Sequence, residues 1–536
     1  MSTKSRFLSR RVPLIFALAA LALALFAPQA SARYVYTGNW DDGTVSVVDT
    51  ATNQVVGNPI PVSEEPETMA ITPNGKTLYV GADGGDDLTV IDTQSNQVVG
   101  SIPLAYEGTK SGAGTIAISP DGKTAFVTAF NLEGVLVIDL QTNQVVGPPI
   151  KTGPNPWGVA FSPDGSFAYV TDESEGELVI IDTAGRQVVG AIPVGEDPIN
   201  VVFSPDGKTA YVVNEGSEDV SIVDVAAKQE VDFIAVGDEP WGIAISPNGS
   251  RVYVSNIEDN NVLAIDTLTR QVVGDPIPTG EEPYELAFTP DGKSVYVTNY
   301  DGDDLGEGEG VTVIDTATNQ TRSIDVNGGP WQLAIVPDQS PASSFTAAAS
   351  KANSLQIGFN STTVDPDGSV AVFDWSFGDG ATALNGGPTP SHSYVQPETY
   401  PVGLTTVDNE GCSTNMVFTG RTAYCSGAAA ATQSLTVKAP NNFKFGKLIR
   451  NKKKGTAKLK VKVPYAGKLT LTGKKVKKVK RSAKKAGTVV LNIRPKPKAK
   501  KALAAAGSLK VRIKVTFKPT GGTARSKGRT VKLIRG

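Results

Sequence analysis

The sequence predicts an all-β chain with several domains. Three observations lead to this prediction. A unit of about 43 residues recurs seven times, each unit alternates short Val- and Ile-rich runs with turn residues, and the last part of the chain alternates apolar residues with lysine. The chain is also long for a single domain, at 536 residues. We therefore expect three folded parts after an N-terminal export segment.

Residues 1–32 have the composition of a signal peptide. Basic residues precede an apolar run at 14–26, and Ala-Ser-Ala at 30–32 supplies small residues for cleavage. The run of 13 apolar residues is short for a membrane span. We therefore predict a secreted, cell-wall-associated product that begins at Arg33 and has no transmembrane anchor after cleavage.

The repeat occupies residues 33–339. The consensus unit reads Tyr-Val-Thr-Asn, an acidic turn, a Val-rich run that ends in Asp, Gln-Val-Val-Gly, and a run that ends in Ser-Pro-Asp-Gly. The leading aromatic residues are spaced by 43, 47, 43, 42, 42 and 43 residues: Tyr36, Tyr79, Phe126, Tyr169, Tyr211, Tyr253 and Tyr296. Four short strands per unit, here named A to D from the axis outward, are typical of a propeller blade.

The two ends of the repeat predict a closed ring. The first unit begins on strands B, C and D at 34–60, and the last ends on a lone A strand at 330–337. Together these pieces make one blade, which joins the first strand to the last and leaves no long free edge. A solenoid would instead need capping units, and the sequence has none. We therefore predict a seven-bladed β-propeller.

These repeats resemble the YVTN β-propeller repeats of bacterial and archaeal surface proteins, and the chain looks like an exported surface protein of the actinobacterial kind. The resemblance covers roughly 300 residues and recurs in every unit. It implies the fold. It does not imply an activity, because propellers include binding proteins and enzymes.

A second domain is predicted at 351–438, after a small, polar linker at 340–350. Its run at 372–380 resembles the W-x-F-G-D-G signature of PKD-type domains, which implies an immunoglobulin-like β-sandwich used for extracellular spacing. Two residues of the signature would face the core and three would form a turn: Trp375 and Phe377, then Gly378, Asp379 and Gly380. After Gly411 an extra segment predicts a hairpin closed by a disulfide between Cys412 and Cys425, since an exported chain with one nearby pair favours oxidation.

The third domain, at 439–536, is predicted to be a basic β-sandwich with a short helix at Pro497–Ala506. Residues 438–536 contain 33 Lys and Arg and no acidic residue, whereas residues 33–339 contain 47 acidic and 12 basic residues, a net charge of −35. Such a basic domain attracts anionic cell-envelope polymers. Nucleic acid is not expected for an exported chain. Head-to-tail self-association with an acidic propeller is an alternative.

The single histidine, His392, restricts the chemistry of the chain. It excludes a Ser-His-Asp system in the propeller and a multi-histidine metal centre. His392 itself is expected to be structural. Because the acidic residues are spread over all blades, we predict that the chain is not an enzyme but a binding and scaffold protein. The alternatives are a lactonase-like hydrolase or lyase that uses carboxylates and a divalent ion, and a self-assembling surface-layer component.

One face of the propeller is predicted to carry a ligand site for a small molecule or a protein. The loops between strands B and C and between D and A lie on this face and contain 31 of the 47 acidic residues. Four aromatic residues follow a proline at the start of an A strand and would surround the channel entrance: Trp157, Trp241, Tyr284 and Trp331. The alternative is that these rings pack between blades and the acids only keep the loops soluble.

The longest of these loops, Asn299 to Gly310, holds five carboxylates. It begins like an EF-hand but has Leu305 and Thr312 where calcium ligands are needed. A looser calcium site remains a hypothesis for five residues: Asp301, Asp303, Asp304, Glu307 and Glu309. The alternative is a solvated acidic flap, and no other cofactor is expected.

Overall fold

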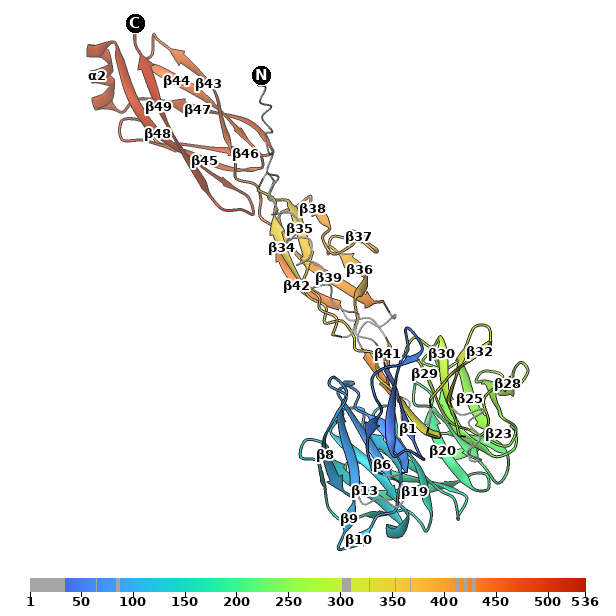
Figure 1. Ribbon diagram of the computed structural model, residues 1–536. Helices are drawn as coiled ribbons and strands as arrows, with labels where there is room; N and C mark the ends of the chain where they lie inside the picture. Colours follow the sequence, from blue (N-terminus) through green and yellow to red (C-terminus); the bar gives the residue numbers. More distant parts are fainter. Residues whose placement is uncertain are drawn as a thin grey trace, which may run out of the picture. The chain divides into compact units, whose positions relative to one another are not determined.

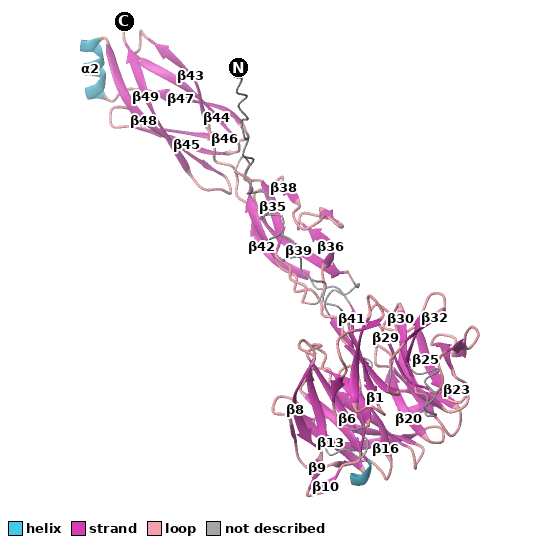
Figure 2. Cartoon of the chain, viewed as in Figure 1, coloured by secondary structure: helices cyan, strands magenta, loops and turns pink. Residues whose placement is uncertain are grey.

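Figure 1 shows a computed structural model of the chain. It describes residues 34–536 except for 64, 83–86, 301–309, 327, 352, 367, 410–414, 419–422 and 427–429, and it does not describe the side chains of 410–430. The predicted signal peptide and the five candidate calcium ligands lie outside the described residues. Almost every described element is a strand (Figure 2), so the all-β class is confirmed.

Seven sheets form the blades, four with four strands and three with five because strand D is split, and in each sheet the innermost strand is an A strand. The A strands are β33 (Pro330–Ile335), β5 (Pro66–Ile71), β11 (Ala113–Ile118), β16 (Pro156–Phe161), β20 (Pro198–Phe203), β24 (Pro240–Ile245) and β29 (Pro283–Phe288). The B strands that pair with them are β1 (Tyr34–Asn39), β6 (Thr77–Ala82), β12 (Thr124–Ala129), β17 (Phe167–Asp172), β21 (Thr209–Asn214), β25 (Arg251–Asn256) and β30 (Ser294–Asn299).

The outer half of each blade is made by strands C and D. The C strands are β2 (Thr44–Asp49), β7 (Asp87–Asp92), β13 (Gly134–Asp139), β18 (Glu177–Asp182), β22 (Asp219–Asp224), β26 (Asn261–Asp266) and β31 (Gly310–Asp315). Four D strands are continuous: β8 (Gln97–Pro103), β19 (Gln187–Pro193), β23 (Gln229–Ala235) and β32 (Thr321–Ile324). Three are split in two: β3 (Gln54–Val55) with β4 (Ile60–Pro61), β14 (Gln144–Val145) with β15 (Ile150–Lys151), and β27 (Gln271–Val272) with β28 (Ile277–Pro278).

The propeller is closed by its first and last strands. β1 pairs with β33 in antiparallel register, Val35 opposite Ile335 and Tyr36 opposite Ala334. Neighbouring A strands contact one another in the order β33, β5, β11, β16, β20, β24, β29 and back to β33. The predicted seven-bladed ring is therefore confirmed.

One repeat spacing is longer than the others because a hairpin is inserted between the second and third blades. β9 (Ala105–Tyr106) and β10 (Thr109–Lys110) form this hairpin, which accounts for the spacing of 47 residues. In the next loop, the 3-10 helix η1 (Phe130–Leu132) replaces the usual turn.

The threonine of the repeat motif joins neighbouring blades. Its hydroxyl donates to a main-chain oxygen at the start of the next A strand: Thr128 to Trp157 (2.7 Å), Thr171 to Ile199 (2.9 Å), Ser255 to Tyr284 (2.6 Å) and Thr298 to Trp331 (2.8 Å). The same hydroxyl accepts a main-chain N–H from the A strand of its own blade. Each such hydroxyl thus satisfies two main-chain groups that the ladder leaves unpaired.

The tyrosine of the motif fixes a turn in the next blade. The Tyr36 hydroxyl donates to Asn96 (2.6 Å) and the Tyr79 hydroxyl to Asn143 (3.2 Å). Both asparagines lie in a C–D turn with a φ of 53°, a left-handed conformation that asparagine tolerates well. The repeated Tyr and Thr are therefore contacts between blades, which explains why the motif recurs at the blade period.

The chain divides into two compact units. One contains the propeller, up to residue 342, together with 365–371 and 407–428; the other contains 343–364, 372–406 and 429–536. The strands that follow the propeller form two sandwiches. The first has sheets β34-β35-β38 and β37-β36-β39-β42. Its strands are β34 (Phe345–Ala349), β35 (Gln356–Ser361), β36 (Val370–Ser376), β37 (Thr382–Ala383), β38 (Ser391–Ser393), β39 (Thr399–Asp408) and β42 (Ala430–Thr436).

The signature residues of this sandwich lie where the sequence predicts them. Trp375 and Phe377 are 1% and 3% exposed, and Gly378 and Gly380 have φ of 79° and 92° in the turn. His392 stacks on Phe377, with ring centroids 4.4 Å apart, and its Nε2 lies 2.8 Å from an Asp379 carboxylate oxygen. These contacts support a structural role for the histidine.

The predicted linker at 340–350 contains a core strand. β34 pairs with β35, and Phe345 is buried against Phe359 and Trp375. The run around Phe345 has small and polar residues, so its composition is that of a linker, but the single aromatic side chain anchors it in the sandwich.

The segment after Gly411 forms the predicted hairpin. β40 (Asn415–Phe418) pairs with β41 (Ala423–Ser426). Cys412 lies outside the described residues and the side chain of Cys425 is not described, so the disulfide remains a prediction.

The second sandwich has sheets β43-β44-β47 and β46-β45-β48-β49. Its strands are β43 (Lys444–Asn451), β44 (Thr456–Val463), β45 (Gly467–Thr472), β46 (Val479–Ala483), β47 (Gly487–Ile493), β48 (Ser508–Pro519) and β49 (Arg525–Ile534). Helix α2 (Pro497–Ala506) matches the predicted bounds, with proline in its first turn and Gly507 in a left-handed C-cap. Among the described residues, no helix is both long and apolar enough to cross a membrane.

Candidate functional site

The B–C and D–A loops meet on one face of the propeller. In six blades the first residue after strand B donates its main-chain N–H to the residue before strand A: Trp40 to Gly329, Phe130 to Gly112, Glu173 to Asn155, Glu215 to Asp197, Ile257 to Glu239 and Tyr300 to Glu282. These bonds are 2.9 to 3.1 Å long. The two sets of loops therefore form one continuous rim, as the blade geometry predicts.

Two residues of each blade define what we call the channel mouth: the second residue of strand A and the first residue after strand B. In chain order around the ring, the A-strand positions are Trp331, Glu67, Gly114, Trp157, Ile199, Trp241 and Tyr284. The loop positions are Trp40, Phe130, Glu173, Glu215, Ile257 and Tyr300, and the corresponding residue of the second blade, Asp83, lies outside the described residues. The mouth thus departs from seven-fold repetition.

Seven half-buried aromatic rings of the mouth form one connected cluster. Their neighbouring centroids are separated as follows: Trp40–Trp331 4.9 Å, Phe130–Trp157 4.9 Å, Trp157–Trp241 5.4 Å, Trp241–Tyr284 5.6 Å, Tyr284–Trp331 3.7 Å and Tyr300–Trp331 5.3 Å. The structure therefore brings together all four aromatic residues that the sequence singles out. Trp157 and Trp241 also pack partly against the hydrophobic core between blades, so ring packing and exposure at the mouth occur together.

Sequence reasoning missed three members of this cluster: Trp40, Phe130 and Tyr300. Each directly follows the last residue of a B strand, at the same place in its repeat. A comparison of the repeats at that position would have found them.

Carboxylates border the aromatic cluster. Burial, followed by the charges of Glu239, Glu173 and Asp197, raises the pKa of Glu215. Burial also raises the pKa of Glu173 and of Glu239, with neighbouring carboxylates adding to it. The Glu173 carboxylate accepts a hydrogen bond from the Asn155 amide, whereas the described residues give the Glu215 carboxylate no such donor. Glu215 is therefore the mouth carboxylate best placed to accept a proton.

Tyr284 lies among these acidic groups. Its pKa is raised well above the usual value by burial and by the charges of Glu282, Glu239 and Glu215. The phenol therefore remains protonated over the whole physiological range and is a hydrogen-bond donor. Tyr284 and Glu215 thus place a donor and an acceptor of protons beside the aromatic surface.

The channel below the mouth is narrow. The third residues of five A strands are buried and polar: Thr68, Thr115, Asn200, Glu285 and Gln332. The cavity along the A strands, which Glu285 also lines, measures about 40 Å³. This volume holds about two or three water molecules.

No metal centre is visible in the part of the chain that the structure describes, where no group of three His, Cys, Asp or Glu side chains is suitably arranged. The calcium hypothesis for the Asn299–Gly310 loop falls on residues outside that part.

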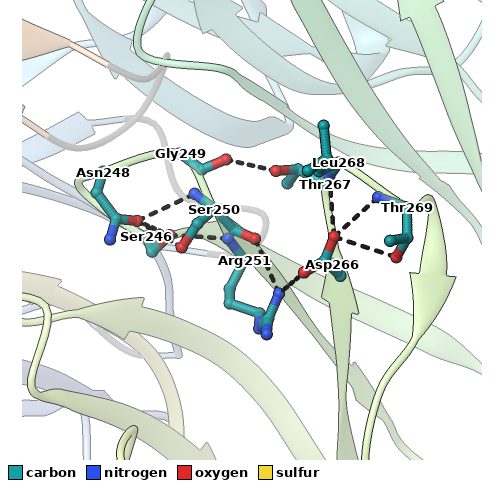
Figure 3. A network of polar contacts seen from close by, with 9 residues as sticks. All are labelled: Ser246, Asn248, Gly249, Ser250, Arg251, Asp266, Thr267, Leu268 and Thr269. Carbon is teal, nitrogen blue, oxygen red and sulfur yellow. Dashed lines mark hydrogen bonds and ion pairs between the residues drawn. The ribbon is translucent and has the colours of Figure 1, made fainter.

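The opposite face of the propeller carries local ion pairs. Its Ser-Pro-Asp-Gly turns pair Lys123 with Asp121 (2.9 Å) and Lys208 with Asp206 (2.8 Å). Figure 3 shows the corresponding region of another blade, where Arg251 pairs with Asp266 and Asp266 also accepts the main-chain N–H of Thr269. The acidic excess of the propeller therefore belongs to the mouth side.

The closed ring of seven blades defines the class of protein, which is a seven-bladed β-propeller. Residues 61–306 match the family model described as lactonase, 7-bladed beta-propeller, and residues 338–422 match the PKD domain model. The chain is a seven-bladed β-propeller repeat protein with a PKD-type domain.

Several solved structures resemble the propeller part. A periplasmic gluconolactonase of Pseudomonas aeruginosa is 21% identical with a TM-score of 0.48, over 57% of this chain and 99% of the other. A putative 6-phosphogluconolactonase of Bacteroides uniformis is 18% identical with a TM-score of 0.47, over 57% and 100%. Hydrazine synthase of Kuenenia stuttgartiensis is 26% identical with a TM-score of 0.45, over 53% and 92%. Scores this low carry no argument about function.

One curated relative, a microbial collagenase of Vibrio alginolyticus, is 32% identical over 90 residues. These residues are 17% of this chain, and the chain spans only about a tenth (11%) of the length of the collagenase.

The prediction that the chain is not an enzyme is wrong at the level of the family. The lactonase family model matches most of the propeller, residues 61–306. The prediction failed because it took the even spread of acidic residues over the blades as evidence against a catalytic site. Individual carboxylates and a phenol can still transfer protons and donate hydrogen bonds.

Proposed function

We propose that the channel mouth binds a neutral, sugar-like ring and hydrolyses a cyclic ester within it. One observation carries the proposal: Glu215, with a raised pKa, and Tyr284, a protonated phenol, border a connected aromatic cluster in a propeller that matches a lactonase family. The proposal includes the role predicted from the sequence, in which the protein displays this site outside the cell. The PKD-type domain, the predicted signal peptide and the basic domain support it.

The aromatic cluster offers a surface for the substrate ring. Stacked and edge-on indoles present flat apolar faces that pack against the C–H groups of a sugar ring, while neighbouring carboxylates accept its hydroxyl hydrogens. Tyr284 and Trp331, whose rings stack 3.7 Å apart, make the most continuous part of this surface.

The proposed reaction needs one proton acceptor and one donor. A water molecule attacks the lactone carbonyl carbon, and the Glu215 carboxylate takes a proton from that water. The Tyr284 hydroxyl donates a hydrogen bond to the carbonyl oxygen, on which negative charge develops. The ring C–O bond then breaks, the leaving oxygen takes the proton back from Glu215, and a hydroxy acid is formed.

Charge selects among substrates. The described positions of the channel mouth include no Lys, Arg or His, and carboxylates surround them. A phosphorylated lactone is repelled by this charge, whereas a neutral lactone is not. The product is an anion, so the same charge favours its release.

The test is hydrolysis of glucono-δ-lactone, measured as acid release above the spontaneous rate. We expect Glu215→Gln to lower kcat by about 10²- to 10⁴-fold, as for loss of a general base. Trp241→Ala should mainly raise KM. The matched control is Glu218→Gln, because Glu218 is an exposed carboxylate of the same loop.

Three results would contradict the proposal. One is a wild-type rate equal to the spontaneous rate, the second is equal loss in the Glu215→Gln and Glu218→Gln variants, and the third is preferential hydrolysis of a phosphorylated lactone. Quenching of tryptophan fluorescence by the lactone measures binding separately from hydrolysis. Binding without hydrolysis would support only the part of the proposal in which the aromatic cluster binds the ring.

A further inference from the structure

The strongest unassigned feature is one face of the second sandwich, on the sheet β46-β45-β48-β49. In β48 the inward side chains Val511, Ile513 and Val515 are buried, so Lys510, Arg512 and Lys514 point outward. Cross-strand register adds residues of the neighbouring strands to the same face. We call this surface the basic face; its cations are Lys468, Lys480, Lys510, Arg512, Lys514, Lys518 and Lys532.

The cations of the basic face have no counter-charge. Residues 431–536 are all described, they contain no acidic residue, and the structure shows no ion pair within them. The side chains of all seven cations are exposed, and no hydrogen bond from their charged groups to the protein is present among the described residues. A surface built only for solubility mixes both signs of charge.

Like charges also lie directly opposite each other. Lys510 faces Lys532 across the β48–β49 ladder, and Lys468 faces Lys518 across the β45–β48 ladder. Like charges directly opposite each other on neighbouring strands oppose folding. The charges repeat at about 7 Å along each strand and about 5 Å between strands. This array is matched by a ligand whose negative charges also repeat.

The face is hollowed beside the loop that follows β45. The hollow measures about 610 Å³, and its lining includes Lys474, Lys475, Lys510, Arg512 and Lys514. Gly473 is needed there, because a Cβ at this position would lie 2.7 Å from the Arg512 carbonyl oxygen. With Lys527, which also lines the hollow, the close approach of loop and strand places six cations around one concavity.

The side-chain chemistry favours phosphate over carboxylate. Lysine binds phosphate as a compact point charge, while bidentate recognition of carboxylates relies on arginine. The face has six lysines and one arginine. Five hydroxyl side chains lie among these cations and can also donate hydrogen bonds to phosphate: Thr470, Thr472, Thr516, Ser526 and Thr530. It has no aromatic side chain on which bases could stack, as single-stranded nucleic acids require.

We propose that the basic face binds a linear phosphodiester polymer of the cell envelope, with its phosphates lying across successive cations of β48 and in the adjoining hollow. This proposal is independent of the reaction proposed for the channel mouth.

The other sheet of the sandwich supplies a matched control. Lys458, Lys460 and Lys462 alternate outward on β44 in the same way, but their face also carries the exposed apolar residues Ile449 (43% exposed) and Val490 (38% exposed). Neutralising these three lysines changes the net charge as much as neutralising Lys510, Arg512 and Lys514 does.

The experiment measures binding of the full chain to soluble poly(glycerol phosphate) by titration calorimetry at several salt concentrations. We expect the variant K510Q/R512Q/K514Q to bind roughly tenfold to a hundredfold more weakly, at a factor of a few per lost cation. Its slope of log affinity against log salt should fall by about 2, at roughly 0.7 per lost contact. The control K458Q/K460Q/K462Q should bind within about twofold of wild type if the opposite sheet makes no contact.

Four outcomes would overturn the proposal. Equal losses in both variants mean that only net charge matters. Equal or tighter binding of polygalacturonate means carboxylate recognition, and tighter binding of duplex DNA means a nucleic-acid partner. If K510Q/R512Q/K514Q dissolves oligomers that the wild type forms without polymer, the partner is a second copy of this chain. If the triple variant fails to fold by circular dichroism, K468Q/K518Q tests the same face and should still weaken binding.

Discussion

At the residue scale, the threonine of the repeat forms hydrogen bonds to two neighbouring blades with one side chain. Thr298 is fully buried, donates to the Trp331 carbonyl oxygen at 2.8 Å, and accepts the Glu285 N–H at 3.0 Å. We expect Thr298→Val to lower the free energy of unfolding by about 1–3 kcal/mol, because two buried main-chain groups lose their partner. Urea denaturation followed by tryptophan fluorescence measures this.

The control for this prediction is Thr321→Val. Thr321 lies exposed on the outer strand β32, so this variant should change stability by less than about 0.5 kcal/mol. A similar decrease in the free energy of unfolding in both variants would show that the hydroxyl between blades contributes no more to stability than an exposed hydroxyl.

We expect the substitution Glu215→Gln to raise the stability of the protein although it lowers the activity. Burial and neighbouring carboxylates raise its pKa in the folded state above that of the unfolded chain. The folded state therefore holds the proton more tightly, and stability falls as the pH rises from the unfolded to the folded pKa. We expect Glu215→Gln to be more stable than wild type at neutral pH and similar to it below pH 4, where both side chains are uncharged.

Thermal unfolding at several pH values tests this prediction. A gain that is the same at acidic and neutral pH would contradict it, because the gain must follow the charge of Glu215.

At the element scale, β34 is a strand of the first sandwich, although the composition of its segment predicts a linker. Phe345 is 3% exposed within a run that otherwise reads as a linker. We expect Phe345→Ala to destabilise the first sandwich by about 3–5 kcal/mol, the usual effect of removing a buried aromatic side chain. Calorimetry of the full chain should show one transition lowered and the propeller transition unchanged.

Thr346→Ala is the control for the Phe345 prediction, since Thr346 is the exposed neighbour on the same strand. An unchanged calorimetric profile for Phe345→Ala would mean that β34 contributes little to the sandwich.

The elements differ in how well the sequence predicts them. Strands A to D, the closing blade and the helix Pro497–Ala506 follow from repetition, alternation and helix end signals, which are local in the sequence. The inserted hairpin at 105–110 appears in the sequence only as a longer spacing. Whether Phe345 is buried depends on its partners Phe359 and Trp375, which no local pattern around it reveals.

The candidate site shows the same limit. The A-strand aromatics could be predicted because each follows a proline at a fixed place in the repeat. The contacts of Trp40, Phe130 and Tyr300 with them depend on how the B–C loops fold over the mouth. The raised pKa of Glu215 depends on burial and on carboxylates from other blades, so it could not be read from one repeat.

At the scale of the whole molecule, ring closure predicts the behaviour of fragments. A fragment that ends at residue 342 retains β33, whereas one that ends at 329 lacks it and leaves one edge of β1 unpaired, although β1 still pairs with β2. An unpaired strand edge pairs readily with other chains. We expect the longer fragment to be monomeric and the shorter one to aggregate. Size-exclusion chromatography distinguishes the two, and a monomeric shorter fragment would contradict the prediction.

The closing pair also determines the order of assembly. The ribosome makes β1 before any other strand of the ring, but its partner β33 is the last strand of the ring to be made. Joining strands so far apart in the chain requires the closure of a very long loop, and such contacts form slowly. Until then, the β33 of a second molecule is an equivalent partner for β1. We therefore expect refolding at high protein concentration to yield strand-exchanged dimers, and refolding at high dilution to yield closed monomers.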